Sequence, residues 1–225
     1  MDGELECGPV AGRDTPTPME DLETERLVLH PLTVAEAERL VAGTPDEHAR
    51  WAVGYPTGGD VVAGRRFLER YATTGDPGPF ANYEIRRRED GQAIGGIGFH
   101  GAPDAHGTVT IGYGLIPTAQ RNGYATESLR GLLDFARTAG VTRVIGDTDH
   151  DNIASQRVMT AAGMRLTRED AELKYYAIDW SEAEAEAEAE AEAEADASVA
   201  VAVAVGVDAG LGSRSPSDQG GSAEV

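Results

Sequence analysis

The sequence is poor in cysteine, in positive charge and in long apolar runs. Its 225 residues include a single cysteine, Cys7, which excludes an internal disulfide and is typical of a reducing compartment such as the cytoplasm. The 19 lysine and arginine residues are outnumbered by 39 aspartate and glutamate residues, which argues against nucleic-acid binding through phosphate neutralisation. No run approaches the roughly 18 apolar residues of a membrane-spanning helix. We therefore expect a cytoplasmic protein that binds neither nucleic acid nor membrane.

The negative charge is concentrated toward the C-terminal end. The formal net charge is −20, and residues 181–225 hold eleven acidic residues and one arginine. Ala-Glu alternation over 182–195 gives no apolar stripe, and each glutamate repels the one four positions on. The first 20 residues contain three prolines and no periodic pattern. We therefore predict a flexible leader over 1–20, one folded domain over 21–180, and a disordered, acidic, low-complexity tail over 181–225 without a catalytic role.

Between these ends, strand and helix patterns alternate. In the helix expected over 60–73, the predicted buried face consists of Val62, Phe67, Leu68 and Tyr71. The order of elements is β-α-α-β-β-β-α-β-α-β-β, which predicts the α/β class (an α+β mixed sheet) with helices on its faces. The predicted strands cover 24–32, 80–88, 92–100, 108–116, 141–146, 164–168 and 173–178, and the helices cover 34–42, 60–73, 124–138 and 152–162.

Residues 120–126 (Gln-Arg-Asn-Gly-Tyr-Ala-Thr) connect a predicted strand directly to a predicted helix. The first N–H groups of a helix have no intrahelical partner, and the helix dipole adds partial positive charge there. Such a terminus suits a phosphate or pyrophosphate, and Gly123 would let the backbone approach it closely. Taken alone, the same seven residues are equally compatible with an ordinary strand-to-helix connection.

Two other patterns indicate chemistry that their context does not support. Residues 96–101 match G-x-G-x-x-G literally, but a dinucleotide site needs a helix directly afterwards, and 102–107 predict a turn. Residues 147–151 hold three aspartates and a histidine, but a calcium loop requires glycine and glutamate where Asn152 and Val158 stand. We therefore expect neither a dinucleotide site nor a metal site.

Two blocks of the sequence together resemble the GNAT acetyltransferase family. The first is Ile-Gly-Tyr-Gly-Leu-Ile-Pro at 111–117 followed by Gln120-x-x-Gly123-x-Ala125-Thr126-Glu127, and the second runs from Asp151-Asn152-Ile153-Ala154-Ser155 through Gly163-Met164. The resemblance covers about 24–180 and is nearest to the branch that contains the ribosomal-protein N-terminal (alanine) acetyltransferases. It implies the acyl-CoA N-acyltransferase fold and transfer of an acetyl group from acetyl-CoA to a primary amine, either a protein N-terminus or a small molecule. A homodimer is compatible with it.

The resemblance also implies where the ligands bind. A backbone N–H near Leu115 and Ile116, at the end of the 108–116 strand, would bind the oxyanion. Ser155 or Tyr175, with Tyr176 as a further donor, would protonate the departing thiolate. Because thiols titrate near ~8.5, a weak acid suffices for that step. Ser155 is equally well explained as a first-turn hydroxyl. The residues assigned to acetyl-CoA binding are Leu115, Ile116, Gln120, Arg121, Asn122, Gly123, Tyr124, Ala125, Thr126 and Asn152.

The sequence departs from the family pattern at the positions of the acid and the base. Many relatives carry glutamate where Thr110 stands, and much of the family has a proton-donating tyrosine where Met159 stands. A base reached through waters could be Glu84, His100 or Asp149, although we expect Glu84 to face solvent. The missing base favours an α-amine, which titrates near ~8, over a lysine at ~10.4. The alternative is a non-catalytic acyl-CoA sensor on the same fold.

Overall fold

The structure, a computed structural model, describes residues 20–181. The predicted disorder of the leader and of the acidic tail therefore falls almost entirely outside the described residues. Contacts divide the chain into two units, residues 1–179 and 180–225. The description below concerns the first unit, which contains all the helices and strands named here. Residues 180 and 181 belong to the second unit.

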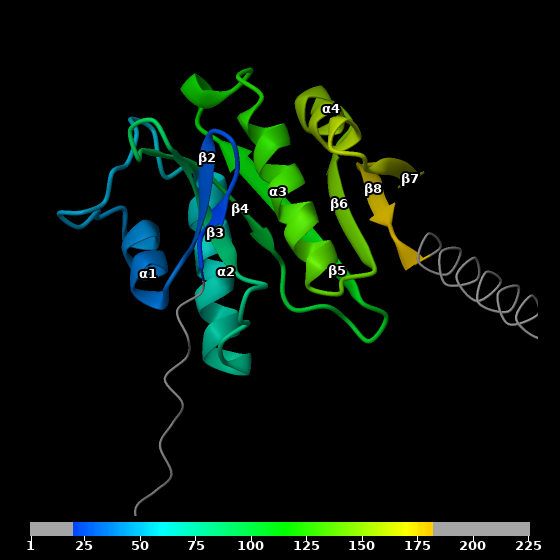
Figure 1. The fold of residues 1–225 in the computed structure, drawn as a ribbon, viewed down its shortest axis with the longest axis horizontal. Helices are drawn as coiled ribbons and strands as arrows, with labels where there is room; N and C mark the ends of the chain where they lie inside the picture. Colours follow the sequence, from blue (N-terminus) through cyan, green and yellow to red (C-terminus); the bar gives the residue numbers. More distant parts are fainter. Residues whose placement is uncertain (1–19, 182–225) are drawn as a thin grey trace, which may run out of the picture. The chain divides into compact units, whose positions relative to one another are not determined.

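The first unit is built on one mixed sheet of eight strands in the order β1-β2-β3-β4-β5-β6-β8-β7 (Figure 1). Neighbouring strands are antiparallel except β5 and β6, which are parallel. The strands are β1 (Leu22–Glu23), β2 (Leu27–Pro31), β3 (Asn82–Arg87), β4 (Ala93–Phe99), β5 (Thr108–Leu115), β6 (Arg143–Asp149), β7 (Arg165–Glu169) and β8 (Leu173–Asp179). The helices are α1 (Val34–Ala42), α2 (Gly58–Thr74), α3 (Tyr124–Thr138) and α4 (Ile153–Ala161).

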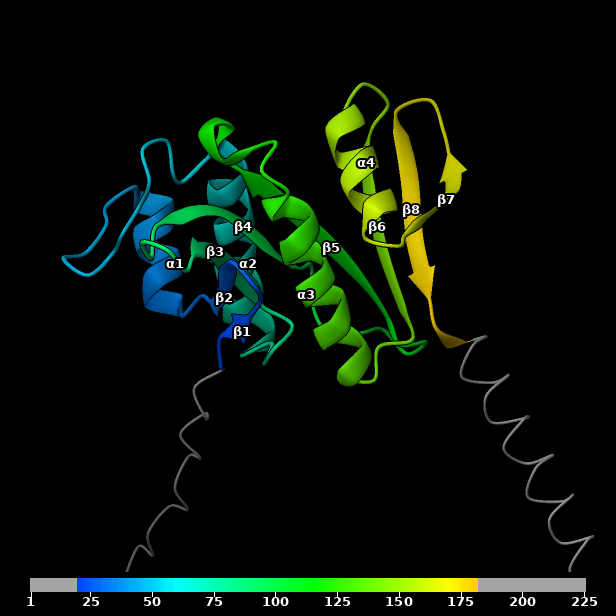
Figure 2. The same ribbon diagram turned by 45° about the horizontal axis from the view of Figure 1, so that its top comes forward.

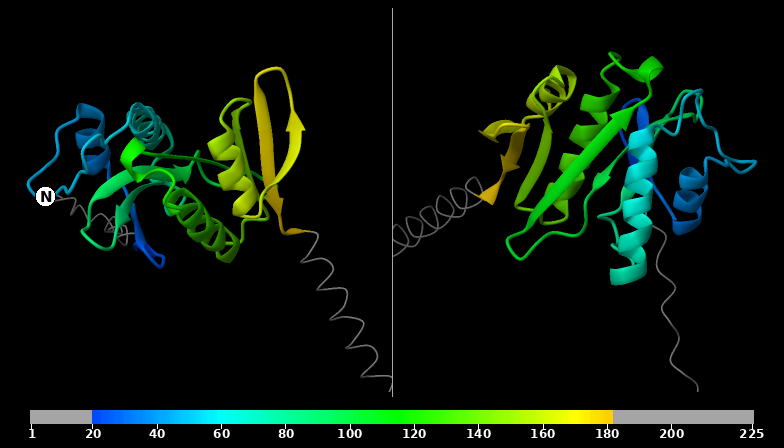
Figure 3. Two further views of the ribbon diagram at one scale, coloured as in Figure 1. Left: turned by 90° about the horizontal axis from the view of Figure 1, so that it is seen from above. Right: turned by 180° about the vertical axis from the view of Figure 1, so that it is seen from behind.

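The helices lie on both faces of the sheet. Helices α3 and α4 lie in front of it in Figure 1 and stay on that side when the molecule is tilted (Figure 2). Seen from behind, α2 crosses the opposite face, with α1 beside it (Figure 3). The predicted fold class and element order are confirmed, with the short strand β1 and a 3₁₀ turn at Pro117–Ala119 as additions.

Apolar packing follows the predicted stripe closely in α3 and less closely in α2. In α3 the buried residues include Leu129, Leu132, Leu133 and Ala136, as expected. In α2 the prediction for Val62 is wrong: its side chain is 47% exposed. Asp60 is buried at the start of that helix instead.

Helix α2 packs against α1 through Gly64, because a Cβ atom there would lie 3.1 Å from side-chain atoms of both Leu40 and Val41. Phe67, three residues further along on the same side of α2, is buried, while Val62 lines an open cavity. The periodicity of one helix does not indicate which of its apolar side chains meet the neighbouring helix, because that depends on the surface of the neighbour.

An ionic cluster joins the start of α1 to β2. His30 hydrogen-bonds Asp21 through Nδ1 (2.6 Å) and Glu36 through Nε2 (3.1 Å). The hydrogen bond to Glu36 is the largest cause that raises the pKa of His30 above its ordinary 6.5, against the lowering effect of burial. Burial alone would raise the pKa of Glu36, but hydrogen bonds from His30 and from the capping residue Thr33 bring it down to about 2.

We predict that His30 stabilises the fold at mildly acidic pH and loses this effect in alkaline solution. A raised pKa contributes stability that is fully present below the unfolded pKa and is lost as the pH rises through the folded pKa. His30→Gln should therefore lower the melting temperature by about 2–4 °C at pH ~6, the equivalent of about 1 kcal/mol in a domain of this size. The difference should shrink as the pH rises. A difference independent of pH would contradict this.

Candidate active site

The loop before α3 has a backbone arranged around unpaired N–H groups. Gly123 is the N-cap of α3 at φ +81°, and no side chain within the described residues caps this helix. Helices α1, α2 and α4, by contrast, have side-chain caps. The first N–H groups of α3, from Tyr124 to Thr126, thus remain available for an anion.

The polar side chains of this loop hold its shape. Gln120 donates from Nε2 to the Leu115 carbonyl at 3.1 Å. Asn122 donates from Nδ2 to the carbonyls of Ala119 (3.2 Å) and Gln120 (3.0 Å). Arg121 is exposed and has a positive φ of 64°. Two of the side chains assigned to ligand binding, Gln120 and Asn122, therefore position the backbone of the loop.

Arg26, which the sequence did not single out, anchors the same loop. Its Nε atom donates to Oε2 of Glu127 at 2.7 Å, and Nη1 donates to the Asn122 carbonyl at 3.0 Å. Its guanidinium lies 4.8 Å from the ring centre of Tyr124. Glu127 would repel an anion at the start of α3, and Arg26 offsets that negative charge. No local pattern signals this contact, because its partners are about a hundred residues apart.

Strands β5 and β6 separate to form a wedge. They pair only from Thr108 with Arg143 to Thr110 with Ile145. Beyond this point β5 pairs only with β4, and β6 only with β8. The resulting cavity, about 270 Å³, is lined by residues 111–113 of β5, 146–149 of β6 and the side of α4 that carries Ser155.

The unpaired edge of β5 directs particular backbone groups into the wedge. The Ile116 N–H donates to the Ile94 carbonyl at 2.9 Å, so the even-numbered residues of β5 direct their backbone groups toward β4. By alternation, the N–H groups of Tyr113 and Leu115 point toward β6. Of the two residues assigned to the oxyanion, Leu115 has its N–H directed at the wedge, whereas Ile116 uses its N–H within the sheet.

Helix α4 brings Ser155 to the wedge and seals its floor with Met159. Asn152 caps the helix by accepting from the Ser155 N–H at 3.1 Å. The Ser155 side chain is half-buried, and the backbone carbonyl of Ser155 accepts a hydrogen bond from the Tyr113 hydroxyl at 3.1 Å. Met159 is buried, and its sulfur would lie 3.3 Å from a Cβ atom at Gly146. A thioether cannot donate a proton.

The three tyrosines near the wedge differ in where their hydroxyls lie. Tyr175 donates to Oδ2 of Asp170 at 2.8 Å and does not line the wedge, so the structure separates it from Ser155. Tyr176 is buried and faces Tyr113 closely enough to affect its pKa. Tyr113 itself reaches α4, and burial raises its pKa to about 12. Sequence reasoning missed Tyr113, although it stands within the first family block.

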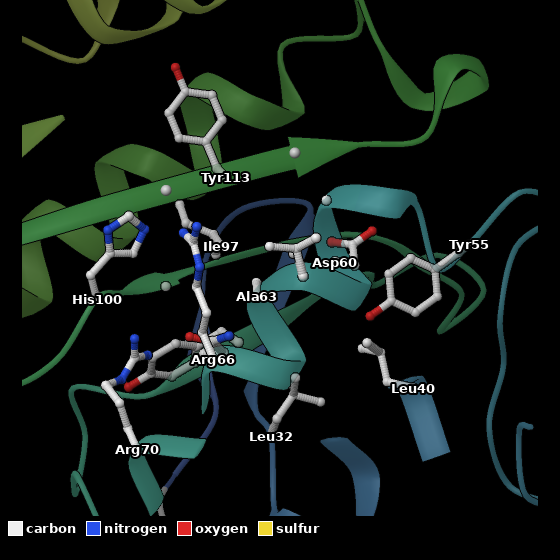
Figure 4. Close-up of a pocket in the computed structure, with 18 residues that line it drawn as sticks. Leu32, Leu40, Tyr55, Asp60, Ala63, Arg66, Arg70, Ile97, His100 and Tyr113 are labelled. Carbon is white, nitrogen blue, oxygen red and sulfur yellow. The ribbon is translucent and has the colours of Figure 1, made fainter. Parts of the chain in front are cut away.

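A second cavity, of about 190 Å³, lies under α2 on the other face of the sheet (Figure 4). Glycines on β4 and β5 make the room for it. A Cβ atom at Gly96 would lie 2.6 Å from Oδ1 of Asp60, whereas one at Gly114 would meet nothing within 4 Å. Gly96, the first glycine of the rejected G-x-G-x-x-G pattern, therefore gives Asp60 room to pack against the sheet, and Gly114 borders open volume.

Two buried acids lie beside this cavity. Asp60 accepts through Oδ2 from the Thr57 N–H and hydroxyl, at 2.7 and 2.6 Å, and burial is the largest cause that raises its pKa. Glu84 is buried next to Gly96 in the sheet register, so the expectation that it faces solvent is wrong. The buried Tyr55 hydroxyl, which has no well-aligned hydrogen-bond partner among the described residues, has its pKa raised by burial and by these carboxylates.

The wedge and the second cavity meet at the middle of β5. His100, Gly112 and Tyr113 line both of them. Burial lowers the pKa of His100 below 6.5, and the charges of Arg70 and Arg66 lower it further. Of the other two candidate bases, Asp149 lines the wedge only, and Glu84 lies on the α2 face with Asp60. A ligand in the wedge and another under α2 would thus approach one another at this point.

The described residues contain neither a metal-binding group of side chains nor a membrane-spanning helix. Within residues 20–181, no group of three or more histidine, cysteine, aspartate or glutamate side chains is arranged to hold a metal ion. In the same part of the chain, every helix is too short or too polar to cross a membrane.

Comparison with known proteins gives a family match over most of this unit. The model described as "Acetyltransferase (GNAT) domain" matches residues 26–165. Among curated proteins, the chain is similar to the uncharacterized N-acetyltransferase YjdG of Bacillus subtilis (strain 168). The two are 28% identical over 162 residues, which cover 69% of this chain and 95% of YjdG.

Solved structures share the fold at lower identity. The ribosomal-protein-S5-alanine acetyltransferase of Vibrio fischeri superposes with a TM-score of 0.52 at 13% identity, covering 71% of this chain and 96% of that one. RimL, a ribosomal L7/L12 alpha-N-protein acetyltransferase solved in complex with coenzyme A, gives a TM-score of 0.52 at 18% identity and covers 71% and 98% of the two chains.

We predict that Gly123→Val raises the Kd for acetyl-CoA by about tenfold or more, equivalent to about 1.4 kcal/mol. A valine at φ +81° strains the N-cap, and its Cβ atom would lie 3.3 Å from the Arg26 guanidinium. The matched control is Gly140→Val, a glycine at φ +80° just beyond the other end of α3. Calorimetric titration of both folded variants should show weaker binding only for Gly123→Val. Unchanged affinity would contradict the assignment of the loop.

Proposed function

The chain belongs to the GNAT acetyltransferase family, and on that premise we propose that it transfers the acetyl group of acetyl-CoA to a primary amine by direct attack in a ternary complex. The observation that carries the proposal is the meeting of the two cavities at Gly112 and Tyr113. One cavity opens on the face that carries α4, and the other lies under α2, so donor and acceptor can approach from opposite faces of the sheet. The low cysteine content supports a cytoplasmic location.

On the donor side, the N–H groups at the start of α3 bind the pyrophosphate, and the wedge receives the chain that leads to the thioester. When bound, acetyl-CoA supplies an activated acyl group with a thiol leaving group. The Leu115 and Tyr113 N–H groups, which point into the wedge, are the donors suited to stabilise the tetrahedral oxyanion. Preformed donors of this kind need no rearrangement during the reaction.

The departing thiolate needs one proton, and two hydroxyls lie near its expected place. The Ser155 side chain lines the wedge, and the Tyr113 hydroxyl lies against the Ser155 carbonyl. We assign Ser155 as the group that donates this proton or holds the water that does. Tyr175, bonded to Asp170 away from the wedge, has no part in this proposal.

On the acceptor side, Asp60 is the group best suited to take a proton from the acceptor ammonium through a water, so that the neutral amine can attack the thioester. Burial raises its pKa toward the working range of a base, and its Oδ1 atom lies close to Gly96 in the cavity wall. Glu84 nearby raises the pKa of Asp60 further. A carboxylate base suits an α-amine, which titrates near ~8, better than a lysine side chain.

The family relationship leaves the acceptor open between a protein N-terminus and a small molecule. We predict that the purified chain acetylates members of an amine panel that contains peptides with free N-termini, polyamines and amino acids, and that α-amines react faster than lysine side chains. Mass spectrometry of the products checks this. A clear preference for lysine ε-amines would contradict the assigned base.

Two residues favour the alternative of an acyl-CoA sensor. Met159 provides no proton donor at the usual position of the acid, and Thr110 provides no carboxylate at that of the base. A sensor would bind acetyl-CoA but would acetylate none of the amines in the panel. Calorimetry and mass spectrometry on one sample distinguish the two functions.

We predict that Ser155→Ala lowers kcat by about ten- to a hundredfold, near the lower end of general-acid effects, and leaves acetyl-CoA affinity unchanged. Thr160→Ala is the matched control, since it removes an exposed hydroxyl from the same helix, one that bonds only the Gln156 carbonyl. If Ser155 only supports the helix start, its loss should cost at most ~1 kcal/mol of stability and no turnover. In that case Tyr113 becomes the better candidate.

A further inference from the structure

The cavity under α2 carries opposite charges on its two sides. Figure 4 shows Asp60 and Tyr55 together on one side and Arg66, Arg70 and His100 on the other. Between them the walls are apolar or glycine, including Ala63, Ile97 and Gly114. A ligand that fits this arrangement has a positive group at one end and a negative group at the other.

Helix α2 sets the spacing, along its axis, of the residues that carry the two charges. Ala63, Arg66 and Arg70 recur at intervals of three and four residues, so they share the face of α2 that lines the cavity. Asp60 precedes Arg66 by six residues, which corresponds to about 9 Å along the helix axis. Arg65 is adjacent in sequence but does not line the cavity.

The two cavity arginines carry charge that the protein leaves unpaired. Within residues 20–181, neither Arg66 nor Arg70 forms an ion pair with a carboxylate. The Arg70 side chain is part-buried, with one contact of 3.5 Å to the Phe99 carbonyl. Burial, and then the charge of Arg66, lower the pKa of Arg70. The two guanidinium charges repel one another, and an anion bound between them would offset that repulsion.

We propose that Arg66 and Arg70 bind an anionic group of the acceptor, a carboxylate or a phosphate, while the acceptor amine lies toward Asp60 and Gly114. Guanidinium groups match the geometry of both anions, and both accept two hydrogen bonds from one arginine. The inference rests on the proposed acetyl transfer, since it places the acceptor under α2 and the donor in the wedge.

The size of the cavity limits the acceptor further. Its volume of about 190 Å³ is only a little larger than that of a ~150 Å³ cavity that holds one benzene molecule. Only the terminal part of an acceptor fits, so the amine and the anionic group are separated by a few bonds. The anion can belong to an acidic residue next to a peptide N-terminus or to a small amine that carries a phosphate.

Competition between matched acceptors tests the proposal. One reaction contains acetyl-CoA with peptides that begin Ser-Asp and Ser-Asn, and another contains O-phosphoethanolamine with ethanolamine, each measured by mass spectrometry. We expect the anionic member of at least one pair to react about tenfold faster or more. This preference should fall toward unity in Arg66→Gln and Arg70→Gln and persist in Arg65→Gln. The pair that shows it identifies a peptide or a small-molecule source.

Three results would overturn the proposal: equal reaction of both members in both pairs, an unchanged preference in the Arg66 and Arg70 variants, or an equal loss in Arg65→Gln. If no acceptor is acetylated although acetyl-CoA binds, the proposed function fails, and the anion site is judged by binding alone. Calorimetric titration of the CoA-bound protein with O-phosphoethanolamine and with the Ser-Asp peptide should then show binding of at least one that weakens about tenfold in Arg66→Gln and not in Arg65→Gln. Absence of binding by both would overturn the site.

Discussion

The separation of β5 from β6 is the constraint on which the rest of this structure depends. Two parallel strands that begin paired and then part leave backbone N–H and C=O groups without partners inside a sheet, which is unfavourable unless a ligand or water bonds them. The outer neighbours hold the two strands apart, because β4 pairs with β5 as far as Leu115 and β8 pairs with β6 as far as Asp149. The wedge is therefore a product of the whole sheet, and both proposed ligand sites are arranged around its edge.

Glycine on the α2 face of β4 and β5 has a complementary role. Gly96 allows the buried carboxylate of Asp60 to lie against the sheet, and Gly114 leaves open space where a side chain would otherwise stand. Side chains at both positions would fill the region through which, in the proposed reaction, an amine approaches the strand. Gly96 also begins the sequence pattern that imitates a dinucleotide fingerprint, because a string match contains no information on the element that follows.

Local patterns in the sequence were sufficient for the element order, the mixed sheet and the strand-to-helix loop at Gly123. Each of these depends on residues within a few positions of one another. Long-range contacts decided the rest. Asp60 is buried against the sheet at Gly96, Glu84 is buried opposite the same glycine in the strand register, and Arg26 reaches Glu127 across about a hundred residues. Periodicity in one segment cannot indicate any of these contacts.

The departures from the family pattern are consistent with a site whose proposed donor and acceptor sides lie on opposite faces of the sheet. Thr110 lies where β5 and β6 are still paired, and Met159 seals the floor of the wedge, so the donor side is shaped mainly by backbone and apolar contacts. The acidic groups are instead gathered under α2, where burial raises the pKa of Asp60. In the proposed reaction, a base placed there would act on the acceptor before the amine meets the thioester. Acceptor choice and acceptor deprotonation would then depend on the same helix, since α2 carries Asp60 as well as Arg66 and Arg70, and a change in its packing would alter both together.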